Sequence, residues 1–425
     1  LSFISSLDFE VRCSTILLKI SSPSLLLKWV EHKVSNCFFA SLIFIGAKKG
    51  KIRNFNFYLF YNMKKSIQFL FLLASAFTLG SCLKGRIPPT ISLPQSRIDS
   101  TFLNYFRLTS GITAGEGTTS LTLSDGRTIW LFGNSHLNDY MSSVNQISCN
   151  TEVHNAAMMS DASFNMTLLN IGSNDFIPIN ESGKWFTPLH AYQYVDTVFV
   201  FAKKMGGLQN TRTYVAKFHY PDLTYLRVDS FLFNSTNYGY TVFLDHAKGF
   251  CYAYGLFNPS VNSDNNMYVA RFPMNSLHDK WQYYSNVNDE WVDPASGATP
   301  IAMVPGENFS IKKIKNKYVF LTQASGKACN KGMEIYSQTS AYLYGPFLNY
   351  QLLHTIEDNL GGNTPVTFGV TLHPQFINPE DEVLITYAIS GYSPCVSTCA
   401  GGYDNPDFYR IRTLRVGLKK IDAAF

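Results

Sequence analysis

Residues 118–133 read "TTSLTLSDGRTIWLFG", two strand-like runs on either side of Asp125-Gly126-Arg127. β-branched and aromatic residues fill both runs, and an Asp-Gly pair between such runs is typical of a tight hairpin turn. The stretch therefore predicts two antiparallel strands.

Runs of the same kind recur along the chain at intervals of about 64 residues. They are "TIWLFG" (128–133), "TVFVFAKK" (197–204), "FCYAYG" (250–255), "KYVFLTQ" (317–323) and "VLITYAIS" (383–390). Each follows another strand-like segment: "TTSLTLSDGR" (118–127), "NAAMMSD" (155–161), "YGYTVFLDH" (238–246), "NFSIKKIKN" (308–316) and "GVTLHPQF" (369–376). Long helical periodicity is missing, so the pattern favours an all-β protein.

Five repeated strand pairs with further outer strands predict a five-bladed β-propeller, because a single small sheet cannot bury both of its faces alone. A two-sheet sandwich is the alternative, but it would not need five similar units. We expect "YRIRTLRVGLKK" (409–420) to close the ring beside a strand near "FLNYFRL" (102–108).

"GITAGEGTTSLTLSDGRTIWLFGNSHL" (111–137) resembles the opening blade of five-bladed propellers known as domains of unknown function 5005 and 4185, which are related to glycoside hydrolase families 43 and 117. Further similarities follow in order along residues 101–420. They are "YAYG" (252–255), "MYVARFPMNSL" (267–277), "KWQYY" (280–284), "YGPF" (344–347) and "TLHPQF" (371–376). The resemblance implies a propeller that handles glycans.

The chain departs from the pattern of these families at two acidic positions. Glu116 stands where Asp is usual, and Asn134 replaces the acid that follows Phe-Gly. An amide cannot exchange a proton at neutral pH, so the second departure bears on activity more than on fold.

Glycoside hydrolysis needs two carboxyl groups, one to protonate the leaving oxygen and one to activate water or attack the sugar. The first strand of each blade begins at the mouth of the central channel, so residues at these starts converge. We predict Glu116 as base or nucleophile and Glu307 as acid. In the alternative interpretation Glu116 caps a turn and Glu307 is a solvated loop acid.

We also predict a substrate-binding set of polar and aromatic residues around the channel mouth. This set is Asn134, His136, His154, Asn155, His190, Tyr238, Tyr240 and His373. The histidines can equally be hydrogen-bonded structural residues. We expect Trp130 and Trp185 in the blade core rather than as sugar platforms.

A bacterial lipoprotein signal, "NMKKSIQFLFLLASAFTLGSCLKG", occupies residues 62–85. Lys64 and Lys65 precede an apolar run too short for a membrane span, and Leu79-Gly80-Ser81-Cys82 matches a lipobox. We predict a signal peptide over 63–81, lipidation of Cys82, a Pro-rich tether over 82–100 and the propeller over 101–425. Residues 1–62 are interpreted as an upstream region outside the mature protein, with a genuine extension as the alternative.

The charge balance follows this division. Residues 1–81 hold 10 of the 35 Lys and Arg residues and 3 of the 30 Asp and Glu residues. The rest of the chain holds 25 Lys and Arg and 27 Asp and Glu residues, so its formal net charge is −2. We therefore expect no nucleic-acid partner. The remaining predictions are a monomer, a membrane contact through the lipid on Cys82, and a place in the bacterial cell envelope, facing the periplasm or the cell surface.

Five cysteines follow Cys82, so at least one thiol is free, and Cys395 and Cys399 are close enough in sequence to pair. They make a poor zinc site without further ligands. The clusters "NSDNN" (262–266) and "DNPD" (404–407) could hold a calcium ion but lack graded loop spacing, so no metal ligand is assigned.

We expect an exported glycoside hydrolase-like propeller that acts on a polysaccharide or oligosaccharide, such as an arabinan. The alternatives are a non-catalytic carbohydrate-binding lipoprotein and a scaffold propeller, because a fold does not fix a function. Neither a Gly-x-Ser-x-Gly nucleophile elbow nor a phosphate loop occurs in the sequence.

Overall fold

The computed structural model describes residues 15–19, 25–34, 37–46 and 96–425, except 151–152, 173, 208–211, 234, 258, 260–263, 294, 308, 325–328, 330, 392–394 and 397–398. The chain divides into two units, Leu1–Thr90 and Ile91–Phe425. The predicted signal peptide and Cys82 lie outside the described residues. No helix of the described ranges has the length and apolar character that a membrane crossing requires.

The first unit contains a three-stranded antiparallel sheet with β2 in the middle. Its strands are β1 (Thr15–Lys19), β2 (Leu25–Val34) and β3 (Cys37–Gly46).

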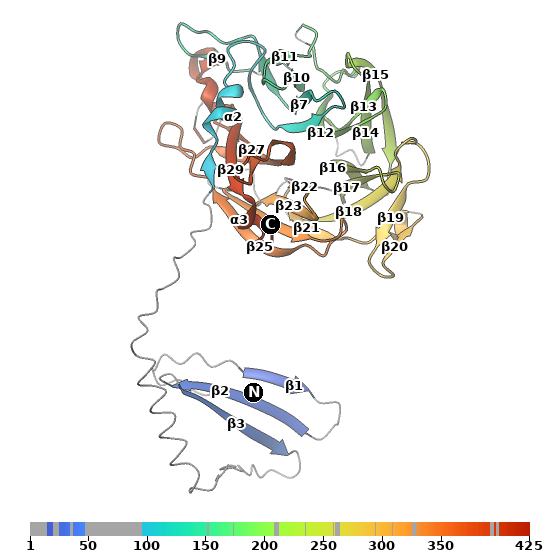
Figure 1. The fold of residues 1–425 in the computed structure, drawn as a ribbon. Coiled ribbons are helices and arrows are strands. Elements are labelled where there is room, and N and C mark those ends of the chain that lie inside the picture. Colours follow the sequence, from blue (N-terminus) through green and yellow to red (C-terminus); the bar gives the residue numbers. More distant parts are fainter. Residues whose placement is uncertain are drawn as a thin grey trace. The chain divides into compact units, whose positions relative to one another are not determined.

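The second unit contains five antiparallel sheets arranged as blades around an axis (Figure 1). From the inner strand outward, blade 1 is β6 (Thr119–Thr122), β7 (Thr128–Phe132), β10 (Ala156–Ser160) and β11 (Met166–Leu168). Blade 2 is β12 (Trp185–Tyr194), β13 (Thr197–Met205), β14 (Arg212–His219) and β15 (Thr224–Leu232).

Blade 3 is the largest. It consists of β16 (Thr236–Asp245), β17 (Phe250–Phe257), β18 (Asp264–Pro273), β19 (Gln282–Ser285) and β20 (Glu290–Val292), with β21 (Ala302–Pro305) also paired to β18. Blade 4 is β22 (Phe309–Ile314), β23 (Lys317–Gln323), β24 (Glu334–Ser340) and β25 (Leu348–Thr355). Blade 5 is β26 (Val366–His373), β27 (Glu382–Ser390), β29 (Arg412–Gly417) and β4 (Arg97–Ile98).

Two small sheets and short helices complete the unit. The sheets pair β5 (Ile112–Gly115) with β8 (Ser135–Leu137) and β9 (Ile147–Ser148) with β28 (Tyr403–Asp404). The helices are α2 (Ser100–Tyr105), α3 (Leu418–Ile421) and four 3-10 turns at 295–297, 374–376, 400–402 and 406–408.

The inner strands contact one another in ring order: β6 with β12, β12 with β16, β16 with β22, β22 with β26, and β26 with β6. This closed order confirms the five-bladed, all-β prediction and excludes the two-sheet sandwich.

The second strand of each blade explains why the sequence favours this ring. In β27 the side chains of Val383 and Ile385 enter the cluster shared with blade 4, and Leu384 and Ala388 enter the cluster shared with blade 1. Side chains alternate across a strand, so a continuous apolar run is buried only if both faces are covered. The core accordingly includes one apolar cluster in each of the five gaps between blades.

Four of the five predicted strand couples are correct, and the couple assigned to blade 2 is wrong. The run "NAAMMSD" forms β10, the third strand of blade 1, and β13 pairs instead with β12. The mistake arises because β12, "WFTPLHAYQY", contains a proline and mixes polar with aromatic residues.

Ring closure follows the prediction, with a partner strand that lies just before "FLNYFRL". The C-terminal β29 pairs with β4, at Leu414 with Ile98 and at Arg415 with Arg97. The segment "FLNYFRL", which follows β4, lies largely in α2 and buries Phe102 and Phe106 between blades 5 and 1. The Asp99 side chain caps this helix by accepting from the backbone N–H of Phe102, which ends the strand and starts the helix.

Candidate active site

A cavity of about 420 Å³ opens where the inner strands begin, and all five blades contribute to its wall. The contributing segments are Glu116–Thr119, Trp185, Thr187–His190, Tyr240, Glu307, Phe309–Ser310 and Phe368–Thr371, with Leu131, Gly133, Asn134, Lys203 and Met205 from the second strands and their ends. The size is that of a small-molecule site.

Bulges in three inner strands shape this wall. The register shifts occur at Leu189-His190 in β12, Gly239-Tyr240 in β16 and Gly369-Val370 in β26. Of these six residues all except Gly239 line the cavity. A bulge adds a residue against its partner strand and re-aims the side chains beside it, so the bulges in these three strands help to shape one cavity wall.

Glu116 lies on the blade 1 side of the cavity and is held by Asn134. The backbone N–H of Asn134 donates to Glu116 Oε1 at 3.4 Å, and the Asn134 side-chain amide donates to the same oxygen. Gly133 permits this approach, because a Cβ there would lie 3.0 Å from Glu116 Cγ. The two positions at which the chain departs from the resembled families are therefore in direct contact.

Glu307 lies on the blade 4 side, in the turn between β21 and β22. Lys203 Nζ donates to both of its carboxylate oxygens at 2.8 Å, and the side chains of Lys203 and Glu307 are 20% and 16% exposed. Glu116 and Glu307 therefore line the same cavity from different blades, and each accepts hydrogen bonds from a neighbouring side chain.

Aromatic side chains cover part of the wall between the two acids. Tyr240 stacks on Phe309 with ring centroids 5.6 Å apart, and Trp185 contributes from the start of β12. Burial, followed by the charge of Glu307, raises the pKa of Tyr240 well above its usual value. Trp130 is core, as predicted. The core assignment of Trp185 is wrong, because this side chain is half-buried and lines the cavity.

A pair of basic side chains includes one residue of the cavity wall. His190 lines the cavity, and His190 Nε2 is hydrogen-bonded to the Nζ of Lys312 on β22. Burial lowers the pKa of Lys312 to about 7. Burial, and next the charge of Lys312, lower the pKa of His190 well below its usual value. Two bases in contact cannot both be charged cheaply without an acid beside them.

The cavity includes three residues of the predicted substrate-binding set, Asn134, His190 and Tyr240, and the others lie elsewhere. Tyr238 is buried in the aromatic cluster between blades 2 and 3. Asn155 is buried and donates to the backbone oxygens of Ile177 and Phe186. Both positions follow from strand pairing that the sequence does not reveal.

Two further histidines also lie off the cavity wall. His373 is at the end of β26, not at its start, and its ring bonds Ser120 and Thr386. Burial lowers the pKa of His373 well below its usual value. His154 is exposed and stacks on Trp185 with ring centroids 4.6 Å apart, so it contacts the cavity only through that tryptophan.

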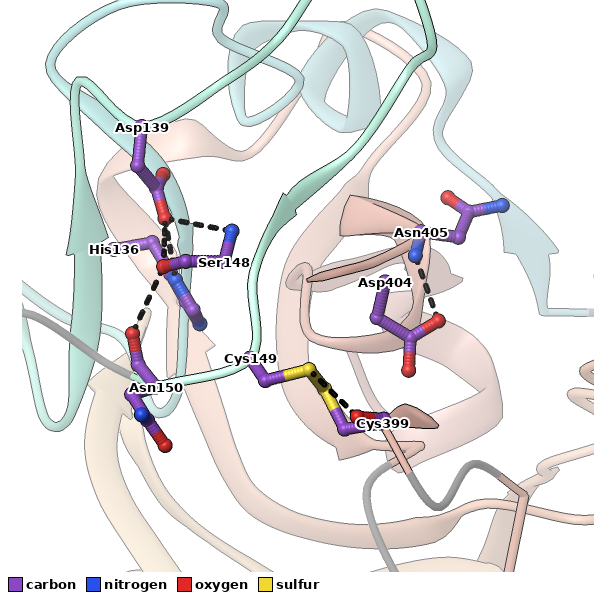
Figure 2. Close-up of a disulfide and its surroundings, with 8 residues drawn as sticks. All are labelled: His136, Asp139, Ser148, Cys149, Asn150, Cys399, Asp404 and Asn405. Atoms are coloured by element: carbon purple, nitrogen blue, oxygen red, sulfur yellow. Dashed lines mark hydrogen bonds and ion pairs between the residues drawn. A yellow bond between two sulfur atoms is a disulfide. The ribbon is translucent and has the colours of Figure 1, made fainter. Parts of the chain in front are cut away.

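His136 belongs to a buried structural network beside a disulfide (Figure 2). His136 Nδ1 lies 2.8 Å from Asp139 Oδ2, and Ser148 Oγ donates to the same oxygen at 2.8 Å. Burial alone would raise the pKa of Asp139, but hydrogen bonds from His136, Thr113 and Ser148 outweigh it and bring the pKa to about 2. The network fixes the segment before Cys149.

The disulfides join Cys149 to Cys399 and Cys329 to Cys395, and Cys251 is a buried free thiol. The suggested pairing of Cys395 with Cys399 is wrong, because each of these residues faces a loop of a neighbouring blade. Cys149 and Cys399 flank the small β9–β28 sheet, which ties the connection between β7 and β10 of blade 1 to blade 5 (Figure 2).

Metal-binding groups are not assembled in the described part of the chain, where no cluster of three or more His, Cys, Asp or Glu side chains could hold an ion. In "DNPD", Asn405 caps a 3-10 turn by accepting from Asp407 N, and Asp404 accepts from Asn405 N (Figure 2). In "NSDNN", residues 262 and 263 lie outside the described residues.

Lys203, Lys312 and Trp185 are the functional candidates that sequence reasoning missed. Lys203 was visible in "TVFVFAKK", where a lysine follows an apolar strand, but its partner is 104 positions away. Trp185 could have been identified from the polar and proline content of β12, which is typical of a strand that lines a cavity rather than a core.

A protein-family model described as Domain of unknown function (DUF5005) matches residues 99–417. None of the curated proteins matches the sequence. Among solved structures, a presumed hydrolase from Bacteroides ovatus ATCC 8483 is similar with a TM-score of 0.60 and 18% identity, over 76% of this chain and 90% of that one.

Two glycoside hydrolase structures are more distant. A GH43 enzyme from Xanthomonas citri, complexed with xylotriose, has a TM-score of 0.41 and 13% identity over 75% of this chain and 93% of its own. A GH43 β-xylosidase/α-arabinofuranosidase from a compost microbial metagenome, also with xylotriose, has a TM-score of 0.44 and 12% identity over 76% and 94%. At such identities the similarity concerns the fold.

Proposed function

The chain belongs to the DUF5005 family, a domain of unknown function, and from this premise we propose that its propeller is a glycoside hydrolase acting on a polysaccharide. The observation that carries the proposal is the placement of Glu116 and Glu307, from blades 1 and 4, on the wall of one open cavity. A pair of carboxyl groups across a sugar-sized space is the requirement of glycosidic bond cleavage.

The two acids have different surroundings, which supports different roles. Glu116 accepts two N–H bonds from Asn134, and an acceptor-only carboxylate suits a base or nucleophile on the anomeric side. Glu307 is proposed as the acid that protonates the leaving oxygen. To carry that proton, one of its oxygens must give up its bond from Lys203 when the substrate enters.

The aromatic wall supplies the substrate-positioning part of the proposal. Trp185, Tyr240 and Phe309 present rings to the cavity, and a sugar ring has an apolar face that can pack on them. Asn134 and His190 add polar groups on the same wall, which is the usual composition of a small-ligand site. An arabinan is one of the polysaccharides that we propose as a substrate.

A second candidate function, carbohydrate binding without hydrolysis, is favoured by the Lys203–Glu307 ion pair. An ammonium that donates to both oxygens of the proposed acid competes with a leaving-group oxygen for them. In this version the cavity holds a glycan and Glu307 serves to position Lys203.

A glycan-library hydrolysis screen tests the proposal. The wild-type chain should release shorter oligosaccharides, detected by chromatography, from at least one polysaccharide. Glu116→Gln and Glu307→Gln should each lower the rate by roughly 10²–10⁴-fold, as loss of an acid or base does. Glu357→Gln, an exposed acid outside the cavity, is the matched control and should keep the wild-type rate.

Products that persist unchanged in both cavity variants would remove the catalytic assignment. Binding of a library glycan without products in any variant would replace hydrolysis with the second candidate. Lys203→Met separates the two further, because it removes the donor that occupies both Glu307 oxygens. It should leave or raise turnover if Glu307 is the acid, and it should weaken glycan binding if Lys203 holds the glycan.

The setting of this activity is proposed from the sequence signal alone. A signal peptide over 63–81 and lipidation of Cys82 would place a monomeric propeller at the bacterial cell envelope, tethered by the residues between Cys82 and β4, close to extracellular or periplasmic glycans. Incorporation of radiolabelled palmitate into the wild-type chain but not into Cys82→Ala checks this, and equal labelling of both would refute it.

A further inference from the structure

A second cavity of about 420 Å³ lies between blades 3 and 4 and shares no lining residue with the candidate active site. Its aromatic part consists of Tyr284 from β19 and of Tyr342 and Tyr344 from the segment that joins β24 to β25. Asn286 and Asp289, in the turn between β19 and β20, form its polar part.

Strand direction places this cavity at the other end of blade 4 from Glu307. The inner strand β22 begins at the first cavity with Phe309 and ends at Ile314, which pairs with Lys317 across the turn. Ser340 pairs with Tyr318 at that far end and immediately precedes the Tyr342 segment. A ligand bound there is therefore separate from the candidate active site.

The three tyrosine rings are nearly parallel. Tyr284 and Tyr344 have ring centroids 4.2 Å apart at an interplanar angle of 16°, and Tyr342 and Tyr344 have centroids 5.8 Å apart at 9°. Tyr284 is buried, but Tyr342 is 59% exposed. The row thus leads from the core to a tyrosine with much of its surface open to solvent.

Hydrogen-bond acceptors lie beside this row. Asp289 Oδ1 accepts from Tyr284 Oη at 2.7 Å, and a carboxylate with one such bond keeps further acceptor sites. The Asn286 side chain donates to the Pro300 carbonyl oxygen at 3.3 Å, which fixes its position at the rim. A ligand that fits needs an apolar face for the rings and several hydroxyl donors for the acceptors.

We propose that this cavity is a second glycan-binding site, which holds a neutral sugar ring of an oligosaccharide on Tyr342 with hydroxyl groups toward Asp289 and Asn286. The Asp289 carboxylate disfavours acidic sugars by like-charge repulsion. A quaternary ammonium ligand is less suited, because an aromatic cage surrounds the cation with rings, whereas these rings are parallel. The proposal stands whether or not the first cavity hydrolyses glycans.

Fluorine NMR of the full chain labelled with 5-fluorotryptophan tests this site locally. Trp291 packs edge-on to Tyr284 at 5.6 Å and reports the second cavity, and Trp185 lines the first. The chain has five tryptophans, so Trp291→Phe and Trp185→Phe assign the two signals. The probes are xylotriose, arabinotriose, cellotriose, mannotriose and galactotriose, with trigalacturonate and choline as the acidic and cationic counterparts.

At least one neutral trisaccharide should shift the Trp291 signal saturably. Tyr342→Ala should weaken that response roughly tenfold or more, because it removes the exposed ring. Tyr350→Ala is the matched control. Tyr350 is 57% exposed on the same blade and stacks on Tyr336 at 4.7 Å, but it lies outside the cavity, so the Trp291 response should be unchanged.

Three outcomes would overturn the proposal. The first is a Trp291 signal that no neutral trisaccharide shifts up to its solubility limit. The second is a response that survives Tyr342→Ala or is equally lost in Tyr350→Ala. The third is a stronger response to choline or trigalacturonate than to any neutral sugar. The Trp185 signal, which should not depend on Tyr342, reports the first cavity separately.

Discussion

The Glu116–Asn134 contact shows how two departures from the resembled pattern compensate each other. Two carboxylates at these positions would repel unless they shared a proton. An amide removes that repulsion and donates to the remaining carboxylate, so Glu116 keeps a fixed position on the cavity wall. Replacement of one acid by an amide thus changes which residue can carry a proton without dismantling the site.

Lys312 gives a prediction about single side chains and pH. Its pKa is about 7 in the folded protein, against an ordinary 10.5, because burial disfavours the charged amine. Below about pH 7 both folded and unfolded states bind the proton, and the folded state bears the full cost of the buried charge. Between about pH 7 and 10.5 only the unfolded state is protonated, so stability rises with pH.

Lys312→Met should therefore raise the free energy of unfolding by roughly 1–3 kcal/mol at about pH 6, and the gain should shrink toward zero by about pH 10. Urea denaturation at both pH values measures this. Lys313→Met, an exposed lysine on the same strand, should show no such pH dependence. A gain for Lys312→Met that is constant with pH would show that its amine is not the cause.

Among strands, the bulges in β12, β16 and β26 connect fold and site. They place Leu189, His190, Tyr240, Gly369 and Val370 on the cavity wall, and they do so at corresponding levels of three blades. In β16 the bulge also requires a close approach to blade 2. Gly239 has a φ of +105°, and a Cβ there would lie 2.3–2.4 Å from side-chain atoms of Phe201.

Gly239→Ala should lower the free energy of unfolding by about 3 kcal/mol or more, since it adds overpacking to backbone strain. Gly249→Ala is the matched control, because Gly249 also has a positive φ, +73°, but faces open space and should cost only about 1 kcal/mol. Urea denaturation of both variants gives the comparison. Equal losses would mean that backbone strain, rather than contact with Phe201, limits the site.

Across the propeller, stability depends on how the ring is closed. Blade 5 combines strands from both ends of the folded unit, and Asp99 joins them: Oδ2 accepts from Arg415 Nε at 2.6 Å and Oδ1 caps α2. Both side chains of this ion pair are 8% exposed. The two disulfides also connect blade 5 or its loops to neighbouring blades.

Asp99→Ala should destabilise the propeller by about 3–5 kcal/mol, because it leaves the Arg415 guanidinium buried without its partner and removes a helix cap. Arg97→Ala is the control. Its ion pair with Glu382 belongs to the same closure but is 56% exposed on the arginine side, so the loss should be below about 1 kcal/mol. Thermal and urea unfolding check both variants. Similar losses would show that pairing of β4 matters more than the buried charge.

Local patterns in the sequence were sufficient for the ring and for part of the site. The apolar runs of β7, β17, β23 and β27 identify strands, and the turn at 125–127 sets the first hairpin. Glu116 and Glu307 could be proposed because they precede inner strands. Signals of this kind lie within a few residues, so they do not depend on partners elsewhere in the chain.

Contacts between distant segments could not be obtained in the same way. The Lys203–Glu307 pair, the His190–Lys312 pair and the Cys149–Cys399 disulfide each join different blades. Which side chains meet depends on strand register, and one extra residue in a strand turns the following side chains to the other face. Three inner strands contain such bulges, so the polar surroundings of both acids emerge only when the blades are packed around the axis.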